Sequence, residues 1–208
     1  MSKKSRAGTS TPSAKKAPDK GLTRRGFLGS SAAAGGVALT AGKVEAAQPK
    51  TLAAKKASLT LNVNGKARTV QVEPRITLLR ALRNELDVTG PKEICDRGAC
   101  GGCSVQIDGK LVNACMMLAV DAAGKKITTV EGLSQDGKLH PLQAEFVKHD
   151  ALQCGFCTPG MLMACKTILD NNKSPDLVTI KKGLRGNICR CGTYTRIFAA
   201  VQAASKQV

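Results

Sequence analysis

The chain has almost no large aromatic side chains. Its 208 residues include no Trp, one Tyr and four Phe, although 42% of them are hydrophobic. Aromatic residues usually supply much of the buried surface of a small domain, so another feature must help to hold this core together. The nine Cys are the obvious candidates, either as disulfides or as metal ligands.

Acidic residues are scarce in the first 50 residues, where Asp19 and Glu45 face ten of the 32 Lys and Arg. From residue 51 onward, 22 basic residues face 13 acidic ones, so the formal charge of +17 falls to +9 over that part. The chain also lacks basic patches interleaved with aromatic residues, which nucleic-acid-binding surfaces commonly use. The charge therefore does not indicate a nucleic-acid partner.

A long apolar run is missing from the N-terminal region as well. Arg24 and Arg25 stand before a weakly apolar, Ala- and Gly-rich run, and small residues that suit cleavage follow at Ala46 and Ala47. Residues 1–47 thus resemble a twin-arginine (Tat) export signal, which implies a periplasmic protein, folded before export, without a stable membrane anchor after cleavage. The alternative is a disordered basic tail.

After a linker at residues 48–57, residues 58–135 show the pattern of a small β-rich domain. Two stretches of alternating apolar residues turn at Asn64-Gly65 and Asp108-Gly109, dipeptides typical of tight β-hairpins. Between them the leucine spacing predicts a helix over residues 77–86, capped by its first Thr. Residues 125–130 are expected to form a closing strand.

Residues 136–208 change to a helical period. Pro141 and Pro159 stand where a first helical residue is expected, and two further helical segments follow after residue 173. We expect a bundle of four helices, so the predicted fold class is α+β. His140 and His149 lie in polar helical stretches and are expected to face solvent.

The first half contains four Cys in one pattern. Cys95, Cys100 and Cys103 have the C-x4-C-x2-C spacing that opens plant-type ferredoxin motifs, and Cys115 follows. A two-iron cluster needs four thiolates around a compact centre. The glycines of this loop, Gly98, Gly101 and Gly102, would permit unusual dihedrals and close approach of backbone N–H groups to sulfur.

The second half contains another set of four. Cys154 and Cys157 form C-x2-C, and Cys189 and Cys191 form C-x-C, which is unusual for zinc sites. We expect the C-x-C pair to wrap one iron of a second cluster. The remaining Cys165 lies in an apolar helix and is expected to be a small buried side chain.

Three motifs together carry a family resemblance. "CDRGACGGC" with the later Cys115, "QCGFCTPGM" and "GNICRCG" resemble the iron–sulfur subunit of the xanthine oxidase family of molybdenum hydroxylases. The resemblance covers about residues 58–203 and is closest to small subunits of periplasmic aldehyde oxidoreductases or isoquinoline oxidoreductase-type enzymes. It implies a plant-type ferredoxin-like (β-grasp) domain followed by a four-helix-bundle domain, each with a 2Fe-2S cluster.

The resemblance also implies a function and partners. A large subunit would carry the molybdenum-molybdopterin cofactor and hydroxylate an aldehyde or N-heterocycle, with Gln153 and Cys191 positioned to hydrogen-bond the cofactor. Electrons would leave through both clusters to a FAD subunit or a c-type cytochrome. Two alternatives remain: a freestanding periplasmic two-cluster ferredoxin, and a protein stabilised by zinc or disulfides.

Overall fold

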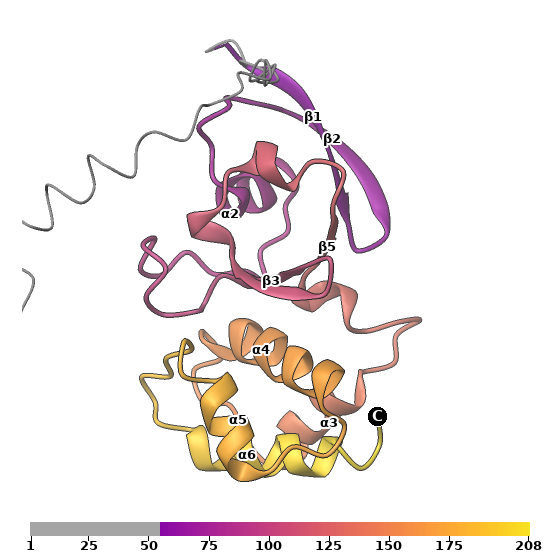
Figure 1. Ribbon diagram of the computed structural model, residues 1–208, viewed down its shortest axis with the longest axis vertical. Coiled ribbons are helices and arrows are strands. Elements are labelled where there is room, and N and C mark those ends of the chain that lie inside the picture. Colours follow the sequence, from indigo (N-terminus) through magenta and orange to yellow (C-terminus); the bar gives the residue numbers. More distant parts are fainter. Residues whose placement is uncertain (1–54) are drawn as a thin grey trace, which may run out of the picture. The chain divides into compact units, whose positions relative to one another are not determined.

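A five-stranded sheet forms the first half of the part that the computed structural model describes, residues 55–208 (Figure 1). The predicted signal at residues 1–47 lies outside the described residues, as does nearly all of the predicted linker. The strand order is β2-β1-β5-β3-β4. The strands are β1 (Ala57–Val63), β2 (Lys66–Val72), β3 (Ser104–Ile107), β4 (Lys110–Asn113) and β5 (Lys126–Thr128).

Both predicted hairpins are present. β1 pairs with β2, and β3 pairs with β4, each antiparallel and each joined by two residues of positive φ. These are Asn64-Gly65, at 52° and 79°, and Asp108-Gly109, at 48° and 79°. Positive φ at both central residues is the geometry that matches the twist of the flanking strands.

The predicted closing strand is shorter than expected and lies in the middle of the sheet. β5 covers only Lys126–Thr128, because the chain turns into a 3-10 segment at Val130–Gly132. It pairs parallel with β1 and antiparallel with β3 and so joins the two hairpins. Its position depends on contacts between distant segments, which local alternation does not report.

The helix predicted over residues 77–86 begins as expected. Thr77 caps it by accepting a hydrogen bond from the Arg80 backbone N–H at 3.3 Å. Only α2 (Leu78–Arg80) is α-helical, however, and the chain continues as a π-helix over Ala81–Glu85. Its leucines belong to the buried core of the sheet half.

Four helices form the second half (orange to yellow in Figure 1). They are α3 (Pro141–Lys148), α4 (Thr158–Asn171), α5 (Leu177–Gly183) and α6 (Tyr194–Ala204). α3 contacts α4 and α6, and α5 contacts the same two helices, around a second apolar core. No helix within residues 55–208 is long and apolar enough to cross a membrane.

The predictions for the starts of α3 and α4 and for the two His were partly right and partly wrong. Pro141 is the first residue of α3 as predicted, whereas α4 begins one residue before Pro159. His140 and His149 are half-buried, not solvent-facing. His140 Nδ1 accepts a hydrogen bond from the Leu142 backbone N–H at 3.2 Å and caps α3, while His149 Nε2 lies 3.1 Å from Glu145 Oε2.

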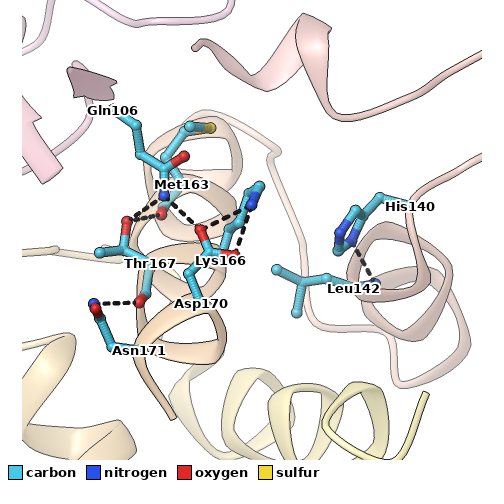
Figure 2. A network of polar contacts seen from close by, with 8 residues as sticks. All are labelled: Gln106, His140, Leu142, Met163, Lys166, Thr167, Asp170 and Asn171. Atoms are coloured by element: carbon cyan, nitrogen blue, oxygen red, sulfur yellow. Dashed lines mark hydrogen bonds and ion pairs between the residues drawn. The ribbon is translucent and has the colours of Figure 1, made fainter. Parts of the chain in front are cut away.

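A buried amide connects the sheet to α4 (Figure 2). Gln106 of β3 is 4% exposed, and its Nε2 donates to Thr167 Oγ1 at 3.0 Å and to Asp170 Oδ2 at 2.9 Å. Lys166 Nζ lies 2.8 Å from the same carboxylate oxygen. Because a buried amide must keep its partners, this network fixes how the two halves meet.

Candidate metal centres

All nine Cys lie within the described residues, and none of them forms a disulfide. Cys165 is fully buried inside α4, which confirms the sequence interpretation. Burial raises its pKa, so it is an inert apolar residue and not a candidate ligand. The other eight gather at two places, one in each half of the described chain.

The first place is the loop before β3 and the turn after β4. The thiol groups of Cys95 and Cys100 contact each other, as do those of Cys103 and Cys115. Cys115 also accepts a hydrogen bond from the backbone N–H of Gly98, with 3.3 Å between N and Sγ. The four residues thus form two neighbouring pairs.

Two of the three glycines of this loop have backbone conformations that require glycine. Gly98 and Gly101 have φ values of 72° and 68°, which residues with a side chain rarely adopt. Gly102 has no such dihedral. A Cβ there would lie 2.3 Å from Ile94 Cδ1, but this is the end of a 45% exposed side chain that can turn away, so neither packing nor backbone conformation requires Gly102.

An arginine holds the same loop from outside. Arg80, where α2 ends, places Nη2 3.0 Å from Glu93 Oε1 and 2.9 Å from Asp96 Oδ2. Glu93 and Asp96 flank Cys95 on either side. Sequence reasoning missed Arg80, because only the fold brings it close to the loop.

The second place lies between the starts of α4 and α6. Cys154 and Cys191 have their sulfur atoms 3.4 Å apart, and Cys157 contacts Cys189. The two members of the C-x-C motif therefore lie beside different partners. This contradicts the expectation that they wrap one iron: the turn between them divides Cys189 and Cys191 between two pairs.

The thiols differ in how easily they ionise. Backbone N–H groups, first that of Arg97, lower the pKa of Cys95 to about 7. Burial disfavours the Cys189 thiolate, but the Thr193 hydroxyl and nearby N–H groups outweigh it, and its pKa is lowered to about 7. Burial raises the pKa of Cys103 and of Cys157 to about 12. A metal is the usual means of deprotonating such thiols.

Two side chains at the start of α6 contact Cys189, a buried cysteine of the second place. Tyr194 Oη accepts a hydrogen bond from the Cys189 backbone N–H at 2.8 Å. Thr193 Oγ1 lies 3.2 Å from Cys189 Sγ. Sequence reasoning missed both residues, although their position directly after the C-x-C motif was a signal that could have found them.

The two places are directly connected. The backbone N–H of Ile188 donates to the carbonyl oxygen of Cys100 at 2.9 Å. Asn187 is 4% exposed, and its Nδ2 lies 3.1 Å from Gly101 O and 3.2 Å from Gly160 O. A Cβ on Gly160 would lie 2.2 Å from Gly101 O, so the backbones of the two halves touch here.

These arrangements fit two-iron clusters. Among residues 55–208, no three His, Cys, Asp or Glu side chains converge as the ligands of a single metal ion do. A two-iron cluster instead distributes its four thiolates over two irons, and each place offers two neighbouring pairs. Thr158, which follows Cys157, has a buried hydroxyl oxygen without a hydrogen-bond partner within the described range, and a cluster sulfur could accept a hydrogen bond from it.

Exposure differs between the two pairs of the second place. Cys154, Cys191 and Gln153 are exposed, whereas Cys189 is 6% exposed. The neighbouring side chains of Phe156 and Ile188 are each 53% exposed. The exposed pair is therefore bordered by apolar surface.

The comparisons with known proteins agree with this geometry. A family described as a 2Fe-2S iron-sulfur cluster binding domain matches residues 61–127, and one described as a 2Fe-2S binding domain matches residues 129–202. The chain is 40% identical to the aldehyde oxidoreductase iron-sulfur-binding subunit PaoA of Escherichia coli (strain K12), over 91% of each chain. It is 45% identical to the nicotine 6-hydroxylase small subunit of Paenarthrobacter nicotinovorans, over 74% of this chain and 92% of that one.

A solved structure gives the same result. Quinoline 2-oxidoreductase from Pseudomonas putida 86 matches with a TM-score of 0.71 and 44% identity, over 73% of this chain and 95% of that one. These matches confirm the ferredoxin-like and helical 2Fe-2S domains and favour a subunit of an oxidoreductase over a freestanding ferredoxin. The chain belongs to the iron–sulfur, electron-transferring subunits of the xanthine oxidase family of molybdenum hydroxylases.

Proposed function

We propose that electrons enter this subunit at the Cys154, Cys157, Cys189 and Cys191 set and leave from the Cys95, Cys100, Cys103 and Cys115 set. The observation that carries the passage of electrons between the two sets is the hydrogen bond from Ile188 N–H to Cys100 C=O. Cys100 belongs to one set, and Ile188 directly precedes Cys189 of the other. Each bound two-iron cluster would take up and release single electrons. The chain itself fixes the separation of the two sets.

The entry face is the exposed pair of the helical half. Cys154 and Cys191 reach the surface together with Gln153, and apolar Phe156 lies beside them. An exposed apolar border around a redox site suits burial against another protein. We place the large molybdenum-cofactor subunit on this face, where Gln153 and Cys191 would hydrogen-bond the cofactor.

The exit face is proposed at the ferredoxin-like half. A FAD subunit or a c-type cytochrome would accept electrons there. The substrate is selected elsewhere, since relatives at similar identity to this chain are named for aldehyde, nicotine and nicotinate. The proposed substrates are accordingly an aldehyde or an N-heterocycle, bound by the large subunit.

Metal analysis of the purified complex tests the two ligand sets. We expect about four irons and four labile sulfides per chain, and two EPR signals after reduction. Zinc in place of iron, or a single EPR-active cluster, would overturn the assignment. Purification of this chain without any large subunit would instead support the freestanding ferredoxin.

We further propose export through the Tat pathway to the periplasm. Replacing Arg24 and Arg25 by Lys preserves the charge, but the pathway reads the arginine pair through a receptor. The double-Lys precursor should therefore remain in the cytoplasm. Undiminished appearance of this variant in the periplasm would reject the assignment.

A further inference from the structure

We propose that the Thr193 hydroxyl donates a hydrogen bond to the Cys189 thiolate and thereby raises the reduction potential of the helical-domain cluster. The inference rests on the proposed ligation of that cluster by Cys189. It assigns Thr193 a role in setting the potential, which the ligand sets alone do not specify.

The first observation is that Thr193 occupies an N-cap position without capping. It directly precedes α6, but its side chain makes no hydrogen bond to the N–H groups of the first helical turn. Thr at this position usually accepts such a bond, as Thr77 does at the start of α2. Thr193 Oγ1 lies instead 3.2 Å from Cys189 Sγ.

The second observation is burial. Thr193 and Cys189 are each 6% exposed, so water has little access to the contact between them. A ligating Cys is a thiolate, which can only accept a hydrogen bond, so the hydroxyl must be the donor. Hydrogen bonds to charged groups are stronger than neutral ones, and a less polar environment strengthens them further.

The geometry of the turn holds this contact in place. Tyr194 Oη accepts from the Cys189 N–H at 2.8 Å, and the Gly192 N–H donates to the Cys189 carbonyl at 3.3 Å. These bonds hold the backbone on both sides of Thr193, so its side chain stays within reach of the sulfur. Reduction adds negative charge around the cluster, and a donor to its sulfur stabilises that state, so the donor raises the potential.

The experiment is an EPR-monitored redox titration of the whole purified complex. Thr193→Val keeps the side-chain shape but removes the hydroxyl. We expect about a ten-fold fall in the equilibrium constant for reducing the helical-domain cluster, which for one electron is about 59 mV. The ferredoxin-like cluster in the same sample should keep its potential, and Thr193→Ser should restore the potential of the helical-domain cluster.

Two controls keep the result decisive. Thr195→Val changes an exposed Thr of the same helix and should leave both potentials unaltered. If Thr193→Val does not retain the cluster, Thr193→Ala applies the same test without the second methyl group. An unchanged potential in whichever of the two retains the cluster overturns the inference.

Cys189→Ser separates this failure from a failure of the ligand assignment. If the helical-domain signal is lost in Cys189→Ser while Thr193→Val has a normal potential, only the role of Thr193 is rejected. If Cys189→Ser retains an unaltered signal and full iron content, the ligand set itself is wrong.

Discussion

The two cysteine sites are held by different parts of the polypeptide. In the sheet half, backbone N–H groups of a glycine-containing loop point at sulfur, as Gly98 does toward Cys115. In the helical half, backbone N–H groups also point at sulfur, but a side-chain hydroxyl at the start of α6 is added to them, as Thr193 shows at Cys189. The first site should therefore be sensitive to changes at glycines, and the second to changes of side-chain chemistry.

Removing one thiolate from each site should have the largest effect. Cys191→Ser and Cys115→Ser should each lose one cluster signal, because each removes one of four ligands. With Cys191 changed, electrons should fail to leave the molybdenum centre after substrate is added. With Cys115 changed, substrate should still reduce the helical-domain cluster, while transfer to the acceptor stops.

Rapid-freeze EPR of the assembled complex would follow this order directly. Normal reduction of the ferredoxin-like cluster by substrate in the Cys191 variant would contradict the proposed sequence of sites. The Cys165→Ala variant is a control for general loss of a thiol, since Cys165 is buried in α4 away from both sets.

The next largest effect is expected where the two halves touch. Gly160→Ala would place a Cβ 2.2 Å from the Gly101 carbonyl oxygen, a backbone atom that cannot rotate away. Overpacking of this kind costs about 1–3 kcal/mol or more of the free energy of unfolding. Gly186→Ala is the matched control, because a Cβ there would meet nothing within 4 Å. Denaturation of the two variants, followed by cluster absorbance, should separate them clearly.

Asn187→Ala should weaken the same contact by a different route. It removes a donor to the carbonyl groups of Gly101 and Gly160. Gly101 O keeps its two hydrogen bonds from Ser104, so we expect the cost of a lost hydrogen bond, about 0.5–1.5 kcal/mol. The exposed Asn171 also donates to a carbonyl, but its replacement by Ala should change stability by less than about 0.5 kcal/mol. Equal stability of the two variants would show that Asn187 does not hold the halves together.

The smallest effect is expected at the cap of α2, which belongs to the sheet half alone. Thr77→Ala removes the acceptor for the Arg80 N–H and should cost about 1 kcal/mol. Thr77→Ser keeps the acceptor and should cost little. A loss of the helical-domain cluster signal in Thr77→Ala would contradict the expectation that the effect stays within the sheet half.

Local patterns predicted most of the elements and the residues that gather at each site. Asn64-Gly65 and Asp108-Gly109 identified both hairpins because positive φ is a local requirement. The four helices were found for a similar reason, since their periodicity and proline starts are properties of short segments.

The parts that sequence could not supply are contacts between distant segments. The central place of β5 and the contact of Asn187 with Gly101, 86 residues apart, depend on how the elements pack. The prediction that Cys189 and Cys191 wrap the same iron was wrong for a related reason. The direction of each thiol is set by the turn between Cys189 and Cys191, which spacing alone does not define.

The close backbone contact between Gly101 and Gly160 has a consequence for protein engineering. Two domains with separate cores invite recombination, in which the ferredoxin-like half of one relative is fused to the helical half of another. Here, the backbones meet with no room for a side chain on Gly160, and Asn187 bonds to both sides. A working chimera must therefore inherit Gly160, Asn187 and the Gly101 loop together, so these segments form one unit of exchange although they are far apart in the chain.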